Sequence, residues 1–402
     1  MVKSAIKKII LCLSFCPLLV CGQELVAQNI PAHVIDHQYE MLLIDALQNI
    51  KDNKIDKALA DLEHLVKVEP KFKLAQLMYG DLLQARSRPI TDFGNFPALP
   101  YNYIASLKDE AKARWQHHLA PPDSEKVPDF LVQLSDDQPY VVAIDTSASR
   151  LYLFQNRKGV PRLVNDFYIS IGKNGFGKFE EGDGKTPIGV YFVNGVLDPH
   201  TLPDFYGVGA FPLDYPNPWD QRFNRTGYGI WLHGTPSNMY SRPPRDSNGC
   251  VILSNPDLLA LEPYIAPGKT PVLLSNGINW IPAGTWQARQ KEYHQFLEQW
   301  RKDWESMDVE LYLNHYAKDY FGLGKDYNSW VAYKRQVTPS KSYIKVDLSD
   351  TSMFLYPGEP GLLVVTFEQD YRSDNVQRKF IKRQYWRKDK DGQWKIVYEG
   401  SA

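Results

Sequence analysis

One cysteine and one histidine in this sequence have the surroundings that thiol chemistry needs. His233 follows the apolar stretch Ile230–Leu232, and Cys250 precedes the apolar stretch Val251–Leu253. Short apolar runs of this kind predict buried strands, so each side chain is expected at the end of a rigid element. A thiol nucleophile needs a base within hydrogen-bond reach. The pair therefore predicts a cysteine nucleophile served by a histidine base.

The cysteine count favours a reactive role for Cys250. The chain has four cysteines, and the other three all lie before residue 22. If the N-terminal residues are removed on export, Cys250 has no internal disulfide partner. A lone cysteine is often a buried packing residue, but the polar sequence Ser247-Asn248-Gly249 directly before Cys250 is poor core material.

The N-terminus reads as a secretory signal peptide, residues 1–22. Basic residues precede an apolar run over residues 9–20, and Gly22 is a small residue at the expected cleavage point. Cleavage after Ala27 is an alternative. A lipid anchor on Cys21 and a retained membrane anchor are further alternatives, although the run is short for a spanning helix. We therefore expect an exported protein of the periplasm or cell envelope.

The remaining composition argues against several classes of partner and cofactor. The formal net charge is −1, whereas a nucleic-acid partner requires a basic face. His117 and His118 are neighbours on a predicted helix and point to different faces, and a single mature thiol leaves no cysteine pair for zinc. The glycine-rich segment Gly182–Gly189 lacks the helix that a phosphate loop requires. We expect no metal and no other cofactor.

Residues 30–125 predict a helical region that ends in a linker. Apolar residues recur with a helical period around 42–50, 58–66 and 74–83, and a further helix is expected over Ser106–Leu119. The second and third stretches resemble one tetratricopeptide repeat, and a plain helical hairpin is the alternative. One repeat cannot bury its own faces. We therefore expect it to dock on a neighbouring domain, on a second copy in a homodimer, or on another envelope protein.

From Gln138 the pattern changes to strands. Tyr140–Ile144 and Arg150–Phe154 flank a polar turn and predict a hairpin. The glycine-rich segment feeds a further strand, and residues 194–229 read as an irregular insertion that walls the cleft. Asp145 and Asp183 fit turn positions better than catalytic ones.

Three motifs in this order resemble the L,D-transpeptidase catalytic domain (YkuD-like). They are Lys185-Thr186-Pro187-Ile188-Gly189-Val190-Tyr191, His233-Gly234-Thr235 and Ser247-Asn248-Gly249-Cys250. The resemblance covers residues 138–276 and implies a mostly-β domain. It also implies that Cys250 is the nucleophile, that His233 is its base and that Gly234 orients the imidazole. The oxyanion hole would be formed by the amides of Gly249 and Cys250, beside Ser247 and Asn248.

Two positions depart from the family pattern. Asn248 stands where the family commonly has a second histidine, and Ile252 where it commonly has an arginine. An asparagine can still donate a hydrogen bond to an oxyanion. Arginine suits bidentate carboxylate contacts, so Arg242 and Arg245 are candidates to replace the missing clamp, with solvated loop charges as the alternative. Trp231 is a third candidate substrate-binding residue.

The tail, residues 285–402, resembles the nuclear transport factor 2-like cone fold. Apolar residues from Tyr293 to Leu311 share a helical face, and a second helix is expected through Tyr316 and Tyr320. The strands expected after them are Tyr343–Leu348, Ser352–Tyr356, Leu362–Tyr371, Arg378–Arg387 and Gln393–Glu399. The abundant tryptophans fit a core better than a ligand-binding box. The fold class is multidomain: an α-helical hairpin region, a mostly-β central domain and an α+β cone-like tail.

The resemblance implies cysteine-dependent acyl transfer on peptidoglycan stem peptides. Thiolate Cys250 would attack the bond between the third residue and the terminal D-residue and form a thioester. Transfer to an amine defines an L,D-transpeptidase, and transfer to water defines an L,D-carboxypeptidase that trims tetrapeptides to tripeptides. A non-catalytic envelope-binding or scaffold protein is a third hypothesis. Roles in cell-wall biogenesis, cell-wall degradation and cell shape follow from these hypotheses.

Overall fold

The computed structural model describes residues 37–87, 89, 93–94 and 100–402. The predicted signal peptide, residues 1–22, and its alternative cleavage and anchoring positions lie outside the described residues. Within the described part of the chain, no helix is long and apolar enough to span a membrane. We call residues 38–119 the helical module, residues 126–282 the central domain, and residues 283–402 the tail.

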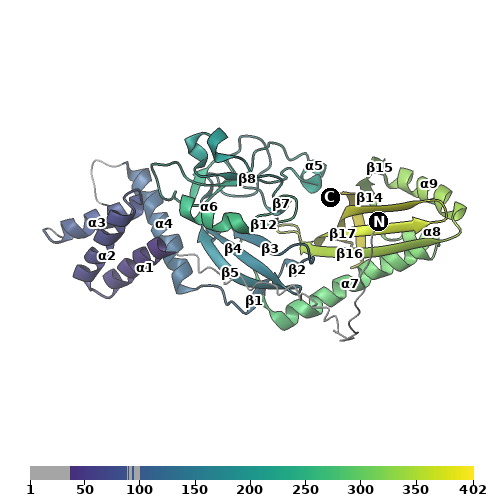
Figure 1. Cartoon of the computed structure of the whole chain (residues 1–402), viewed down its shortest axis with the longest axis horizontal. Helices are drawn as coiled ribbons and strands as arrows, with labels where there is room; N and C mark the ends of the chain where they lie inside the picture. The colour runs from purple at the N-terminus through teal and green to yellow at the C-terminus, as the bar shows by residue number, and fades with distance from the viewer. Residues whose placement is uncertain (1–36, 88, 90–92, 95–99) are drawn as a thin grey trace, which may run out of the picture. The chain divides into compact units, whose positions relative to one another are not determined.

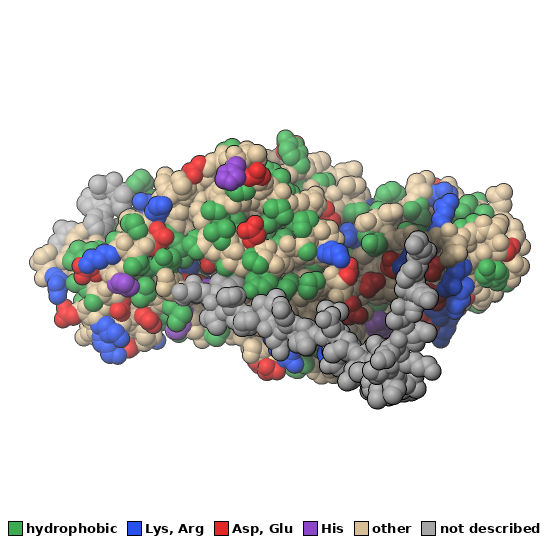
Figure 2. All heavy atoms as spheres, in the orientation of Figure 1, with side chains coloured by type: hydrophobic (Ala, Val, Ile, Leu, Met, Phe, Trp, Pro, Cys, Tyr) green, Lys and Arg blue, Asp and Glu red, His purple; other side chains and the backbone are tan. Residues whose placement is uncertain are grey.

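The helical module forms where the sequence has amphipathic periods. Its helices are α1 (Gln38–Lys51), α2 (Ile55–Val68), α3 (Lys73–Ala85) and α4 (Tyr101–Leu119) (Figure 1). Leu43, Leu62 and Leu74 are fully buried in the cluster between them, so the three predicted periodic stretches are confirmed as helices. α4 begins before the predicted Ser106, because Pro100 precedes it and the fixed φ of proline is compatible with a helix start. On the exposed surface, acidic and basic side chains both occur (Figure 2).

The central domain is built from short sheets, as expected for a mostly-β domain. One sheet has the order β5 (Val160–Tyr168), β4 (Arg150–Arg157), β3 (Tyr140–Asp145), β12 (Pro271–Ser275) and β7 (Gly189–Phe192). Another has the order β11 (Val251–Ile252), β9 (Trp231–His233) and β8 (Ala210–Pro212), and shorter pairs join β10 (Arg245–Ser247) to β6 (Ile171–Gly172) and β1 (Lys126–Pro128) to β13 (Trp280–Pro282). The helices α5 (Pro218–Arg222) and α6 (Asn255–Leu261) lie in connections. Ile144, Phe211 and Leu232 are buried together in one apolar cluster between these sheets.

The tail begins with helices and continues with long strands, as predicted. Its helices are α7 (Ala283–Glu305), α8 (Val309–Leu313) and α9 (Tyr327–Val337). Its sheet has the order β15 (Lys325–Asp326), β14 (Tyr316–Gly322), β19 (Trp394–Ser401), β18 (Gln377–Lys388), β17 (Leu362–Ser373), β16 (Ile344–Leu355) and β2 (Leu131–Gln133). α7 runs alongside this sheet (Figure 1). Trp300, Trp304, Trp330 and Trp386 are buried, so their predicted role in the core is confirmed.

The helix predicted through Tyr316 and Tyr320 is wrong. Both residues lie in the strand β14, although their spacing matches a helical period. The register between β14 and β19 shifts between Tyr316 and Phe321. Residues four apart lie on one face of a strand as well as of a helix, so both tyrosines are buried and their spacing does not distinguish the two elements.

The separate strands predicted at Tyr343–Leu348 and Ser352–Tyr356 form one strand, β16. Its register with β17 shifts between Ser349 and Ser352, and Asp350 has a positive φ of 49°. A positive φ is uncommon for a residue other than glycine. This local break interrupts the apolar alternation, which is why the sequence reads as two strands.

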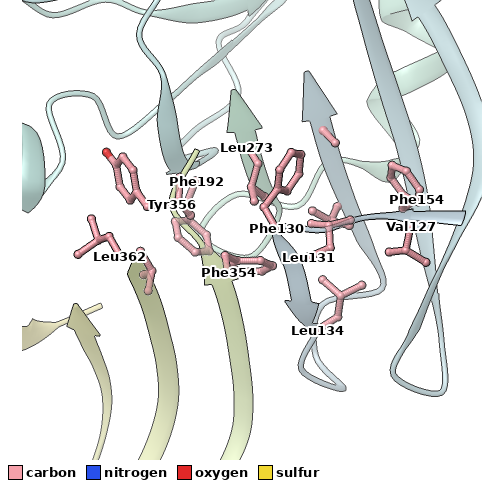
Figure 3. Close-up of a cluster of buried hydrophobic side chains, with 14 of the residues drawn as sticks. Val127, Phe130, Leu131, Leu134, Phe154, Phe192, Leu273, Phe354, Tyr356 and Leu362 are labelled. Atoms are coloured by element: carbon pink, nitrogen blue, oxygen red, sulfur yellow. The ribbon is translucent and has the colours of Figure 1, made fainter. Parts of the chain in front are cut away.

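Apolar packing and strand pairing join the tail to the central domain. β2 of the central domain pairs antiparallel with β16. Phe354, Tyr356 and Leu362 of the tail lie in one buried cluster with Phe130 and Leu131 of the central domain (Figure 3). We call these five residues the tail junction.

Charged side chains join the helical module to the central domain. The Glu40 carboxylate lies 3.0 Å from the Arg114 guanidinium and 2.5 Å from the Arg150 guanidinium. Arg114 also pairs with Glu110 at 2.9 Å, and both arginine side chains are 2% exposed. Tyr240, from the loop between β9 and β10, belongs to the apolar cluster of the module. We call these five residues the helical junction.

Candidate active site

The candidate residues His233 and Cys250 belong to neighbouring strand segments. β9 and β11 are parallel, with Leu232 opposite Val251 and His233 opposite Ile252. Leu232 and Val251 are fully buried, which fixes both strands in the core. His233 ends β9 and Cys250 directly precedes β11. Both side chains are therefore carried by rigid backbone, the arrangement that precise positioning of a reactive group requires.

His233 and Cys250 line the same cavity, whose volume is about 440 Å³. Ser247 and Asn248 line it beside Cys250, and Tyr206 lines it from the irregular insertion. The prediction that the insertion walls the cleft is therefore confirmed. The Tyr206 ring packs edge-on against the His233 imidazole, with 5.1 Å between the ring centroids.

The imidazole of His233 is buried, with 1% of the residue exposed. Its Nδ1 lies 2.7 Å from the carbonyl oxygen of Gly234. A carbonyl oxygen can only accept, so Nδ1 carries the proton and Nε2 keeps its lone pair. Burial lowers the pKa of His233 to about 4, the Gly234 contact opposes that change, and the charge of Arg242 reinforces it. At neutral pH the imidazole is therefore uncharged and able to accept a proton.

The Cys250 thiol is partly buried and free of any disulfide. Its sulfur donates to the carbonyl oxygen of Gly229 at 3.3 Å. Burial raises the pKa of the Cys250 thiol, whereas the backbone N–H of Trp231 and the charges of Arg242 and Lys178 lower it, and the net change is upward. The resting group at neutral pH is therefore the thiol rather than the thiolate.

The described structure contains no hydrogen bond between the thiol of Cys250 and the imidazole of His233. Cys250 Sγ is directed to Gly229 O instead. Catalytic hydrogen bonds are often long in the absence of substrate and tighten in the substrate complex. The geometry is therefore that of a neutral thiol and a neutral imidazole on one cavity wall, and the thiol must turn from Gly229 to meet the base.

The segment before Cys250 is held by its own side chains. Ser247 Oγ donates to Cys250 O at 2.7 Å and accepts the Gly249 N–H at 3.0 Å. Gly249 has a φ of +129°, and a Cβ there would lie 2.8 Å from Lys185 O, so the position requires glycine. The Gly249 amide is thus engaged. The Cys250 amide has no hydrogen-bond acceptor among the described residues, so of the two amides predicted for the oxyanion hole it is the one that remains free to donate.

Gly234 directly follows His233 in the chain, and a Cβ on it would collide with Asn255 Oδ1. That oxygen accepts the N–H groups of Thr235 at 3.1 Å and Val208 at 3.2 Å. Asn255 Nδ2 donates to Thr235 O at 2.9 Å. Asn255 therefore fixes the backbone that follows His233. Sequence reasoning missed Asn255, because no motif links a polar residue at the start of α6 to this turn.

The candidate substrate-binding residues Trp231, Arg242 and Arg245 are not among the described residues that line the cavity. Arg242 is buried, its guanidinium lies 4.7 Å from the centre of the Phe205 ring, and it donates to Asp246 O at 3.1 Å. Arg245 is exposed in β10, and Trp231 is half-buried. Arg242 therefore lies close to the site, where it packs on the cavity residue Phe205. Arg245 is exposed on the surface.

Sequence reasoning also missed Lys178, a buried cavity residue. Its Nζ lies 2.9 Å from the Asp183 carboxylate. That carboxylate also accepts the N–H groups of Phe179 at 2.8 Å and Lys185 at 3.0 Å, so the predicted turn role of Asp183 is confirmed. No motif marks Lys178, because the glycine-rich segment around it is recognisable only as a loop.

Among the described residues, no group of three or more His, Cys, Asp or Glu side chains is placed to hold a metal ion. His117 pairs with Asp166 at 2.9 Å. His118 packs against Trp115, with 5.3 Å between the ring centroids. The two neighbouring histidines therefore have different partners, as the helical geometry predicts.

Comparisons with known proteins find two family models and several solved structures. The L,D-transpeptidase catalytic domain matches residues 139–274, and the Cds6 C-terminal NTF2-like domain matches residues 292–400. Bd1075 of Bdellovibrio bacteriovorus is 31% identical, with a TM-score of 0.62, over 69% of this chain and 98% of that chain. The helical cell shape determining protein Pgp2 of Campylobacter jejuni is 25% identical, with a TM-score of 0.57, over 68% of this chain and 95% of that chain. No curated protein matches the sequence.

The two family matches fall on the central domain and the tail, in the order that the sequence motifs predict. The multidomain fold class is therefore confirmed. The match to Bd1075 extends over nearly all of that chain. The chain belongs to the family of proteins in which an L,D-transpeptidase catalytic domain is followed by an NTF2-like domain.

Proposed function

We propose that the protein performs cysteine-dependent acyl transfer on peptidoglycan stem peptides, with Cys250 as the nucleophile and His233 as its base. The observation that carries this proposal is the shared cavity, which both side chains line. The uncharged imidazole supports it too, because its Nε2 can accept the thiol proton. The L,D-transpeptidase family model over residues 139–274 supports the choice of substrate class.

The reaction begins when the thiol turns from Gly229 and transfers its proton to Nε2 of His233. The sulfur attacks the carbonyl carbon between the third residue and the terminal D-residue of the stem. The amide N–H of Cys250 donates to the oxyanion that forms, and a donor of this kind typically changes the rate by about a hundred- to a thousand-fold. The C–N bond then breaks, His233 returns the proton to the leaving amine, and a thioester remains on Cys250.

The thioester is resolved by a second nucleophile. An amine of another stem forms a new amide bond and a cross-link, whereas water forms a carboxylate and a tripeptide. In both cases His233 takes a proton from the nucleophile and the Cys250 thiol is restored. Transfer to an amine is the first proposal, because it is the activity for which the family domain is described.

We further propose that this chemistry takes place in the cell envelope and contributes to cell shape. The similarity to a protein described as a helical cell shape determining protein supports the second point. The basic and apolar N-terminal sequence supports export.

The test uses residues 28–402 with purified tetrapeptide muropeptides and follows the products by mass spectrometry. The proposal predicts dimers joined between third residues, with loss of one terminal D-residue for each bond formed. Tripeptides without dimers would assign the carboxypeptidase reaction instead. In either reaction, Cys250→Ser should lower the rate by at least about a thousand-fold, since a hydroxyl replaces the thiol nucleophile.

His233→Asn is the matched control for the base, because an asparagine amide can still donate a hydrogen bond toward Gly234 O. It should retain substrate binding and lose turnover. If the wild-type protein binds muropeptides but forms no product, and Cys250→Ser binds equally well, the catalytic proposal is contradicted. The scaffold hypothesis would then be the supported one.

A further inference from the structure

The loop from Gly234 to Asp246 connects the proposed base to the proposed nucleophile, and its middle rests against the helical module. The module, residues 38–119, lies outside both family matches. It nevertheless contacts three consecutive loop residues, Tyr240, Ser241 and Arg242, directly or through one intervening side chain. Through these contacts, residues of the module can influence the position of a charged group near the site.

Tyr240 is the apolar anchor of this loop. Its ring centroid lies 4.5 Å from that of Phe72 and 5.6 Å from that of Tyr39, and the residue is 6% exposed. Its backbone N–H donates to Lys71 O at 3.2 Å. A buried aromatic ring has a large apolar surface, so Tyr240 ties the loop firmly to the core of the module.

Glu110 of α4 is the polar anchor. It accepts a hydrogen bond from Ser241 Oγ at 2.7 Å and is paired with Arg114. The Arg114 guanidinium lies 3.8 Å from the centre of the Tyr168 ring. Tyr168 in turn donates its hydroxyl to Arg242 O at 3.0 Å. Side chains of the module therefore fix the backbone directly before and at Arg242.

Arg242 carries this positioning toward the thiol. Its guanidinium packs on Phe205, a cavity residue, and its charge acts on both His233 and Cys250. The other charged and titratable groups that line the cavity with Cys250 are Lys178, Glu181, His233, Tyr206 and Tyr228, and Asp246 pairs with Arg242. Arg242 is the member of this set that the helical module holds.

We propose that Tyr240 and Glu110 are positioning residues that act through Arg242 to set the reactivity of Cys250. The proposal rests on the proposed role of Cys250 as the nucleophile. The helical module, which lies outside the family model, thereby influences the chemistry of the site. Tyr240 and Glu110 touch neither the thiol nor the cavity, so their effect is indirect.

The test measures the pH dependence of Cys250 alkylation by iodoacetamide in residues 28–402, where Cys250 is the sole cysteine, with intact mass as the readout. A nearby positive charge lowers a thiol pKa, so displacing Arg242 should raise it. Tyr240→Ala should raise the thiol pKa by about half a unit or more, which slows alkylation at pH 7 about threefold. Arg242→Ala should raise it at least as much, and the double variant should add nothing further.

Ser241→Ala removes one hydroxyl and serves if Tyr240→Ala does not fold. It should shift the thiol pKa in the same direction by a smaller amount. Tyr240→Phe, which keeps the ring, should restore the wild-type profile. Val68→Ala alters an exposed side chain of the same module that lies outside its apolar cluster, so the profile should stay unchanged.

The proposal is overturned if Tyr240→Ala and Ser241→Ala fold and leave the alkylation profile unchanged. It is equally overturned if the effect of Tyr240→Ala is undiminished in the Arg242→Ala background. Alkylation does not require muropeptide turnover. A protein that forms no product but shows the shift would contradict the proposed function and support the positioning role.

Discussion

The two junctions of the central domain differ in how deeply their charges are buried, since the ion pairs that reach the tail, Arg222–Asp319 and Arg225–Glu359, have partly exposed carboxylates. The tail junction is apolar, with Phe354 fully buried, and strand pairing between β2 and β16 reinforces it. The helical junction is built on buried charges, with Glu40 between Arg114 and Arg150. Apolar burial is insensitive to direction and to pH, whereas buried ion pairs depend on geometry and protonation. The tail is therefore held mainly by apolar burial. The module is held by buried ion pairs, and the same contacts fix one loop of the central domain.

The largest expected effect concerns the tail junction. Phe354→Ala should destabilise the protein by about 3–5 kcal/mol, because it removes a fully buried aromatic side chain and leaves a cavity. The loss should appear in urea unfolding of the central domain and the tail together. Leu323→Ala, at a side chain in the tail that is 48% exposed, is the control and should change stability by less than about 0.5 kcal/mol. A loss confined to tail signals would contradict a shared core.

The second largest effect is expected at the helical junction, which should lose stability in acid. Burial alone would raise the pKa of Glu40, but Arg150 and Arg114 outweigh it and hold that pKa far below its usual value. The stabilisation is therefore complete above about pH 4.5 and is lost as the pH falls below it. Glu110 does not add to this loss, because burial raises the pKa of its carboxyl.

Hydrogen exchange of residues 38–119 measures this acid response. Protection of the module should decline below about pH 4 while the tail junction keeps its protection. At neutral pH, Glu40→Gln should weaken the module by about 3 kcal/mol, since it removes the carboxylate that the buried Arg114 and Arg150 share and leaves each with one charged partner. Equal acid sensitivity at both junctions would contradict the distinction between them.

The sequence predicts these junctions unevenly, for physical reasons. Helical periods around Leu43, Leu62 and Leu74 identify the module because an amphipathic face is a local pattern. The pairing of β2 with β16 is invisible, because it joins segments distant in the chain. The same holds for Glu40 and Arg150, whose partnership depends on how α1 docks on β4.

In the candidate site too, local motifs predict some residues, whereas contacts between distant segments could not be predicted. His233, Ser247, Asn248 and Cys250 were identified from local motifs, and they line one cavity. Lys178 and Asn255 were not identified, since their contacts arise when loops close on each other. The chosen clamp residues failed to reach the cavity for a related reason: a loop arginine gives no sign in the sequence of the direction it faces.

A smaller effect is expected in the thiol itself. Burial raises the pKa of Cys250, so alkylation by iodoacetamide should rise with pH through a midpoint above the ordinary thiol value of about 8.5. The neutral His233 should add no acidic limb between pH 5 and 7. Fast alkylation that is independent of pH from pH 5 upward would instead indicate a preformed thiolate–imidazolium pair.

The smallest predicted effect is on the pH midpoint of Cys250 alkylation, and it should differ between variants of the two junctions. Glu40→Gln should raise the thiol midpoint by about 0.3 unit, because Glu40 and Glu110 share Arg114 and thereby hold the loop that carries Arg242. Phe354→Leu, a mild change at the tail junction, should shift it by less than about 0.1 unit. Equal shifts in both variants would mean that general destabilisation, rather than the loop, sets thiol reactivity.

The central claim is that Cys250 forms a thioester with a stem peptide and that His233 serves as its base. Intact-mass analysis of residues 28–402 during turnover of a tetrapeptide muropeptide tests it most directly. The account predicts an added mass equal to the donor without its terminal D-residue, located on Cys250, lost on hydroxylamine treatment and strongly reduced in His233→Asn. Product formation without acylation of Cys250, or undiminished acylation in His233→Asn, would contradict it.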